Sequence, residues 1–292
     1  MKLGTLAYLP PRGIGTKRDP VSGVNVPICS PATFLSNVRK FKTKYPVILY
    51  GDRDHDWGDD VIRLYGRVDE GADRFAKLPN GQQNSFVLNN VAFFTGLRVA
   101  YRQGITHVIY LEADCRVGCD DWDAKIFDAH FKHPRHVVCT GSAVCYNPCN
   151  AGTAAMQRWC EFIGTHNKGR KNFPIPTYGW KSAADGGGSC VFVNGAGGSY
   201  DVAWLLRWFG HILNATDGSG IRKLSEASFA WDFQIGLNLW VDFGIAAYDM
   251  IQHTDVIYSS YGDVLSTPAD RMKMLRDGKV ALIHQIKGDE TV

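Results

Sequence analysis

The feature that most constrains the fold is a short apolar run that ends in two closely spaced acids. Val108–Leu111 contains no polar residue but the Tyr110 hydroxyl, and Glu112 and Asp114 follow with one residue between them. Such a run is typical of a strand buried on both faces of a parallel sheet. Ligands of open α/β sheets bind at the carboxyl ends of strands. Hard carboxylate oxygens there suit Mg²⁺ or Mn²⁺, so the sequence predicts a site for a divalent cation and a diphosphate.

The residues before this strand predict a helix over Ser85–Gln103. Apolar side chains recur along one face at helical spacing, which is typical of a helix that packs on a sheet. These side chains are Val87, Val91, Phe94 and Tyr101, with Leu97 beside them. Gly104 follows as a C-terminal stop. The local order is therefore helix, tight turn, buried strand and acidic pair.

Strand and helix patterns alternate over the first 140 residues, which predicts an α/β fold. We expect a mainly parallel central sheet covered by helices, in a single domain over residues 1–292. The expected strands are 1–10, Val47–Tyr50 and Val137–Cys139, and the expected helices are Pro31–Lys44 and the segment after Asp121. Residues 11–30 are interpreted as a Gly/Pro-rich loop.

The run from Asn90 to Asp114 resembles the nucleotide-binding half of GT-A glycosyltransferases. The matching positions are Gly96, Ala100, Gly104 and Leu111-Glu112-Ala113-Asp114. In that family an Asp-x-Asp motif holds the metal of a metal–nucleotide-sugar complex, and Glu112 replaces its first Asp here. The resemblance implies a Rossmann-like GT-A fold, in which residues 1–140 bind the nucleotide sugar and residues 141–292 bind the acceptor.

The resemblance implies a metal site formed by Glu112, Asp114 and His284. His284 ends the apolar run Val280–Ile283, and Lys287 follows it where the family places a lysine on the diphosphate. A neutral imidazole together with carboxylates suits Mn²⁺, with Mg²⁺ as the other choice. A histidine at a strand end with a structural role is the alternative.

Other donor contacts follow from the same resemblance. Tyr8, at the end of the first strand, is expected to help hold the nucleotide, and Asp52, after the second, to contact the base or ribose. Gly195 and Gly197 lie in a strand-to-helix turn that is expected to line the donor sugar. These glycines can equally serve close packing, and Asp52 stands in a loop crowded with other acids.

The segment from Glu226 to Gly236 resembles the acidic segment behind the acceptor site of inverting GT-A enzymes. There a carboxylate takes the proton from the acceptor hydroxyl, and it must lie within hydrogen-bond reach of that proton. Asp232 is the first candidate for this base and Glu226 the second. The alternative for Asp232 is a charge that complements a helix N-terminus.

The resemblance as a whole implies a metal-dependent, hexosyltransferase-type glycosyltransferase. It would move a sugar from a nucleoside diphosphate sugar, with UDP-sugars favoured, to the hydroxyl of a glycan or other acceptor. Asp232 as the base implies inversion, and retention stays open as the alternative. Two alternatives stay open. Gly13–Arg18 resembles the phosphate loop of sugar-1-phosphate nucleotidyltransferases, and a non-catalytic nucleotide- or sugar-binding module would share the same donor residues.

The net charge and the cysteines restrict the partners and the location of the protein less strongly than the motifs restrict its activity. The formal net charge is +3, but it is unevenly distributed. The first 44 residues are rich in Lys and Arg and contain one acidic residue, Asp19. This basic region fits a phosphate-rich partner, so a nucleic-acid acceptor stays an alternative. No segment is apolar and long enough to span a bilayer. We expect a cytoplasmic protein with reduced cysteines, although Cys115 and Cys119 have a spacing that zinc permits.

Overall fold

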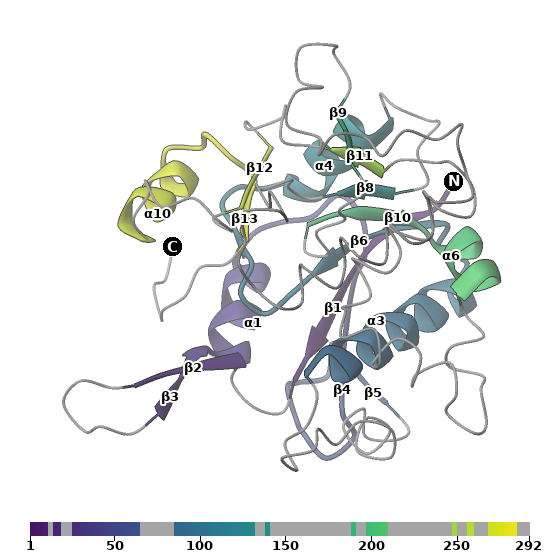
Figure 1. The fold of residues 1–292 in the computed structure, drawn as a ribbon, viewed down its shortest axis with the longest axis horizontal. Helices are drawn as coiled ribbons and strands as arrows, with labels where there is room; N and C mark the ends of the chain where they lie inside the picture. The colour runs from purple at the N-terminus through teal and green to yellow at the C-terminus, as the bar shows by residue number, and fades with distance from the viewer. Residues whose placement is uncertain are drawn as a thin grey trace, which may run out of the picture.

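The computed structural model describes ten segments of the chain (Figure 1). These segments are residues 1–10, 14–18, 25–64, 85–131, 138–140, 188–190, 197–209, 247–249, 256–259 and 268–284. Among them, no helix is long and apolar enough to cross a membrane.

An eight-stranded mixed sheet forms the centre, in the order β5-β4-β1-β6-β10-β8-β11-β9. Its first four strands are all parallel; they are β5 (Val61–Arg63), β4 (Val47–Gly51), β1 (Leu3–Leu9) and β6 (His107–Leu111). The other four mix both directions; they are β10 (Ser199–Asp201), β8 (Val138–Thr140), β11 (Ala247–Asp249) and β9 (Gly188–Cys190). The predicted α/β class with helices on a largely parallel sheet is confirmed, with β10 inserted antiparallel between β6 and β8.

Helices cover both faces of the sheet, as the alternation of side chains along β1 requires. Leu6 and Tyr8 face a core shared with α3 (Ser85–Arg102) and α6 (Val202–Phe209). Ala7 and Leu9 face the opposite core, which holds α1 (Pro31–Lys40) and α4 (Trp122–Phe131). The parallel strands are therefore buried on both sides, which explains why their sequences read as continuous apolar runs.

A second, three-stranded sheet lies beside the central one and joins distant parts of the chain. Strand β13 (Leu282–His284) pairs in parallel with β12 (Ile257–Ser259) and antiparallel with β7 (Arg116–Val117). Helix α10 (Pro268–Arg276) packs against this sheet (Figure 1). Because β7 follows β6 after the acidic pair, this pairing carries the C-terminal part of the chain to the carboxyl end of β6.

Three local predictions were wrong. Helix α1 ends at Lys40 rather than Lys44, because Asp120 and Asp123 accept the backbone N–H groups of residues 42, 44 and 45 and draw that segment away from a helical path. The expectation that Tyr101 belongs to the buried face of α3 is also wrong: Tyr101 is 59% exposed, whereas the predicted Val91, Phe94 and Leu97 are buried.

The third error is the loop expected over residues 11–30. Residues 14–18 form β2 (Ile14–Arg18) and residues 25–29 form β3 (Asn25–Cys29), and the two strands pair as an antiparallel hairpin. Both segments contain β-branched residues, which favour a strand over a loop. The glycines and prolines that suggested a loop flank or interrupt short strands instead.

Candidate metal centre

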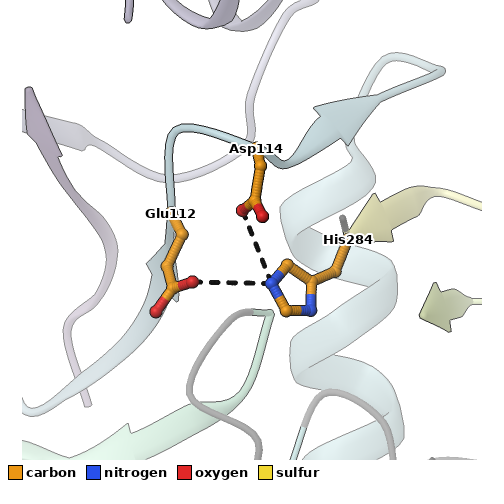
Figure 2. Close-up of side chains that lie close together, drawn as sticks. All are labelled: Glu112, Asp114 and His284. Atoms are coloured by element: carbon orange, nitrogen blue, oxygen red, sulfur yellow. Dashed lines mark ion pairs between the residues drawn. The ribbon is translucent and has the colours of Figure 1, made fainter. Parts of the chain in front are cut away.

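Three predicted side chains meet at the carboxyl end of β6. Figure 2 shows His284 pointing between Glu112 and Asp114, with its Nε2 atom 3.5 Å from Glu112 Oε2 and 3.4 Å from Asp114 Oδ1. One ligand atom from each residue lies within 4.8 Å of the other two. The His284 side chain is 5% exposed and those of Asp114 and Glu112 are 16% and 29% exposed, so the cluster opens to solvent on its carboxylate side.

Strand pairing explains how residues so far apart in sequence come together. Glu112 and Asp114 follow β6 directly, and the chain then runs into β7. Ile283 pairs with Arg116 and Leu282 with Val117, so β13 runs antiparallel to the strand that leaves the acidic pair. This register places His284, the last residue of β13, beside Asp114.

Opposite charges dominate the electrostatics of the cluster. Burial acts to lower the pKa of His284, but the charges of Asp114 and Glu112 outweigh burial and raise it to about 10. Burial acts to raise the pKa of Asp114, but the adjacent His284 cation outweighs burial, and the pKa is lowered. Without a metal, the cluster is therefore a buried ion pair held by a proton on His284.

The donor set fits a divalent cation. Asp114 Oδ1 is buried, and its contact with His284 Nε2, at 3.4 Å, is an ion pair that lacks the geometry of a good hydrogen bond. A cation between the two carboxylates and a neutral imidazole would satisfy this oxygen in place of the proton. Two hard oxygen ligands with one imidazole suit Mn²⁺ or Mg²⁺. Within the described segments, neither Cys115 nor Cys119 joins a group that could hold a metal, and both are free thiols.

Arg116 is a buried cation directly behind the cluster. Its side chain is fully buried, and its Nη1 atom donates to the carbonyls of Ala113, at 3.1 Å, and Cys115, at 2.7 Å. These two carbonyls flank Asp114, so the guanidinium holds the turn that presents this carboxylate. The positive charge of Arg116 also helps to lower the pKa of Asp114.

Tyr8 and Asp52 lie together at the carboxyl ends of β1 and β4, which are neighbours in the sheet. The Tyr8 hydroxyl donates to Asp52 Oδ1 at 3.2 Å, and both side chains are buried. Tyr8 is the second-last residue of β1, and Asp52 directly follows β4. Because β4, β1 and β6 are adjacent and parallel, this pair and the metal candidates share one edge of the sheet.

Gly197 reaches the same edge from β10. Its φ of 74° lies in the left-handed region that favours glycine. Its N–H donates to the carbonyl of Tyr110 at 2.7 Å, two residues before Glu112. The other predicted site residues, Gly195, Glu226, Asp232 and Lys287, lie outside the described residues.

Sequence reasoning missed two residues that hold this site. Arg116 stands two positions after Asp114, and a single arginine after an acidic motif carries no recognisable signal. Asn37 is buried on α1 and hydrogen-bonds β7. Its signal was a polar residue on the apolar face between Phe34 and Val38.

Two proteins of known structure to which the chain is similar are glycosyltransferases. Mouse xyloside xylosyltransferase 1, in its apo form, is 12% identical with a TM-score of 0.44, over 97% of this chain and 96% of that chain. The galactosyltransferase LgtC, in complex with donor and acceptor sugar analogues, is 14% identical with a TM-score of 0.39, over 97% of this chain and 86% of that chain. No protein-family model matches the sequence, and no curated protein matches it.

Proposed function

We propose that the protein is a metal-dependent glycosyltransferase that uses a nucleoside diphosphate sugar. The observation that carries this proposal is the convergence of Glu112, Asp114 and His284 at the carboxyl end of a central parallel strand. Two carboxylates and an imidazole could hold a divalent metal there, at the edge of the sheet where nucleotides bind in α/β folds.

We assign a different role to each group of residues at this edge of the sheet. Glu112, Asp114 and His284 would hold Mn²⁺ or Mg²⁺, which when bound neutralises charge on the departing diphosphate as a Lewis acid. Arg116 keeps the Asp114 turn in place through the two flanking carbonyls. Tyr8 and Asp52, on the adjacent strand ends, would contact the nucleoside, and Gly197 would line the site of the donor sugar.

The acceptor half of the proposal rests on sequence. Asp232, with Glu226 as second candidate, would take the proton from an acceptor hydroxyl, and Lys287 would contact the diphosphate. A base in this role gives inversion at the anomeric carbon. Proton NMR of the anomeric signal of the first product checks this, because retention would remove Asp232 from the role of base in a single displacement.

Donor hydrolysis tests the core of the proposal. UDP-, GDP- and dTDP-sugars are incubated with the protein and Mn²⁺ or with a chelator, and the released nucleoside diphosphate is measured. We expect metal-dependent release from one donor class, with UDP favoured, and loss of release in Asp114→Ala. Asp59→Ala, which removes an exposed acid outside the cluster, is the control and keeps the activity.

A second assay and a binding measurement separate the alternatives. Pyrophosphate release from a nucleoside triphosphate and a sugar 1-phosphate would indicate a nucleotidyltransferase. Its required phosphate loop is disfavoured because residues 14–18 pair with β3 as a strand, which occupies backbone groups that such a loop would offer to phosphates. Nucleotide binding without turnover on any acceptor would indicate a binding module.

A further inference from the structure

Asn37 makes an unusual contact between α1 and β7. It stands in the interior of the helix, where asparagine is a poor helix former, and its side chain is buried. Asn37 Nδ2 donates to the Val117 carbonyl at 3.0 Å, and the Val117 N–H donates to Asn37 Oδ1 at 2.8 Å. The carboxamide thus meets both backbone groups of Val117 as a neighbouring strand would.

The other edge of β7 holds the strand that carries His284. Val117 pairs with Leu282, and the Gly118 N–H donates to the Ala281 carbonyl at 3.1 Å. With its two residues, β7 can form only a few backbone hydrogen bonds to neighbouring strands. It lies between the amide of Asn37 on one edge and β13 on the other, directly after the turn that presents Asp114.

We propose that Asn37 is a positioning residue for the metal centre. Its amide fixes β7, and β7 fixes the register of β13, so that His284 is held against Glu112 and Asp114. The inference rests on the proposed function, because it concerns the metal ligands named there. Asn37 itself contacts neither the ligands nor the metal position in the interactions described above; it acts through the backbone of Val117.

Metal coordination makes such positioning measurable. Ligand distances in a working site vary by only about 0.2 Å, whereas a strand without a partner on one edge can shift by more than that. Removing the amide also leaves the buried N–H and carbonyl of Val117 without partners, which favours a rearrangement of β7. Loss of residues that orient metal ligands typically weakens metal binding by about 10–100-fold.

Two variants of Asn37 and one control test the proposal. Asn37→Asp keeps an acceptor for the Val117 N–H but sets a carboxylate oxygen against the Val117 carbonyl, and Asn37→Leu removes both hydrogen bonds. Val38→Ala is the matched control, because it removes buried methyl groups from the next residue of α1 and from the same core as Val117, but leaves both hydrogen bonds of Asn37 to Val117 in place. Thermal unfolding without metal shows that each variant is folded and how far it is destabilised.

Two readouts are independent of turnover. Isothermal titration calorimetry with MnCl₂ gives the metal affinity. Amide hydrogen exchange of the metal-free protein reports on Val117, whose N–H donates to Asn37, and on Gly118, whose N–H donates to the Ala281 carbonyl where β7 meets β13. We expect both Asn37 variants to bind Mn²⁺ about 10–100-fold more weakly and to exchange faster at these two amides. Val38→Ala should keep the wild-type affinity and the slow exchange at both amides.

The outcomes distinguish this inference from the function on which it rests. If the wild-type protein binds no Mn²⁺, the proposed function fails. If it binds Mn²⁺ and folded Asn37→Asp binds equally well, the positioning role is wrong. An equal loss of affinity in Val38→Ala would also overturn it, because Asn37 would then act through general stability. Should Asn37→Leu fail to fold, the nearly isosteric Asn37→Asp decides.

Discussion

At the scale of single residues, the protonation of His284 makes the stability of the folded protein depend on pH. Without metal its pKa is about 10 against an ordinary value of 6.5, so the folded protein holds this proton more tightly than the unfolded chain. The resulting stabilisation is complete below pH 6.5 and is lost as the pH rises through about 10. Asp114, whose pKa is lowered, contributes above its ordinary value of 3.8 and loses its contribution as the pH falls below it.

The first prediction compares wild type with His284→Gln in the presence of a chelator. Their difference in the free energy of unfolding should be largest at mildly acidic pH, between 3.8 and 6.5. It should then fall by about 1.4 kcal/mol per pH unit above pH 6.5, until the proton is lost from the folded protein. Chemical denaturation across this range measures the difference. A difference independent of pH would mean that His284 is neutral in the metal-free cluster.

The second residue-scale prediction separates the nucleoside contact from the metal contact. Asp52→Asn keeps the shape of the side chain but removes the charge, and Tyr8→Phe removes the hydroxyl that donates to it. If Asp52 contacts the nucleoside, Asp52→Asn should weaken the binding of UDP both with Mn²⁺ and with a chelator. Asp114→Asn should weaken only the Mn²⁺-dependent part.

Calorimetric titration with UDP measures both parts. Tyr8→Phe should destabilise the protein by about 1 kcal/mol, the usual value of one internal hydrogen bond. Unchanged UDP binding in Asp52→Asn would restrict Asp52 to the structural contact with Tyr8.

At the scale of helices and strands, the close approach of α3 to β4 gives a third prediction. Gly96 lies over Tyr50, and a Cβ atom at this position would stand 2.5 Å from Tyr50 Cζ. The Tyr50 ring is fully buried, and its hydroxyl donates to the Ala92 carbonyl at 2.8 Å. Gly to Ala in a helix interior normally stabilises by about 1 kcal/mol, but here overpacking should reverse the sign and destabilise by about 1–3 kcal/mol.

A double-mutant cycle checks the cause. Gly96→Ala in the background of Tyr50→Leu should cost less than in the wild type, because the shorter side chain removes the atoms that the new Cβ would meet. Equal costs in both backgrounds would assign the effect to another contact of α3.

The elements also show what the sequence could and could not predict. Strands β1, β4 and β6 and helix α3 were predictable because each is a continuous apolar or periodic pattern with a clear boundary. Strand β10 was not, because Ser199 and Asp201 are polar and their extended form depends on pairing with β6 and β8. The hairpin of β2 and β3 likewise depends on a partner that a local pattern does not identify.

The same reasoning applies to the candidate site. The acidic pair and His284 were found because each stands at the end of an apolar strand. Their order along the chain is that of the GT-A motifs, which suggested that they meet. How they meet depends on β7, a two-residue strand, and on the amide of Asn37. Hydrogen bonds between residues eighty positions apart leave no periodic signal in a single sequence.

At the scale of the whole molecule, the site ties the C-terminal strand to the central sheet. Glu112 and Asp114 leave β6, whereas His284 arrives from β13, which belongs to the second sheet. A metal bound by all three would connect the two sheets, and it binds the folded chain in preference to the unfolded one. Metal should therefore stabilise the entire cooperative unit rather than a local segment.

The last prediction follows from this coupling. Mn²⁺ at about 100 times its dissociation constant should add about 2.7 kcal/mol to the free energy of unfolding, which corresponds to a rise in Tm of roughly 4 °C for a chain of this size. Differential scanning calorimetry should show one transition that moves as a whole in the wild type and in Asp59→Ala, and that stays in place in Asp114→Asn. Two transitions, of which one alone responds to Mn²⁺, would mean that the sheets unfold separately. An equal shift in Asp114→Asn would place the bound metal elsewhere, because the variant lacks the carboxylate charge at the centre of the cluster.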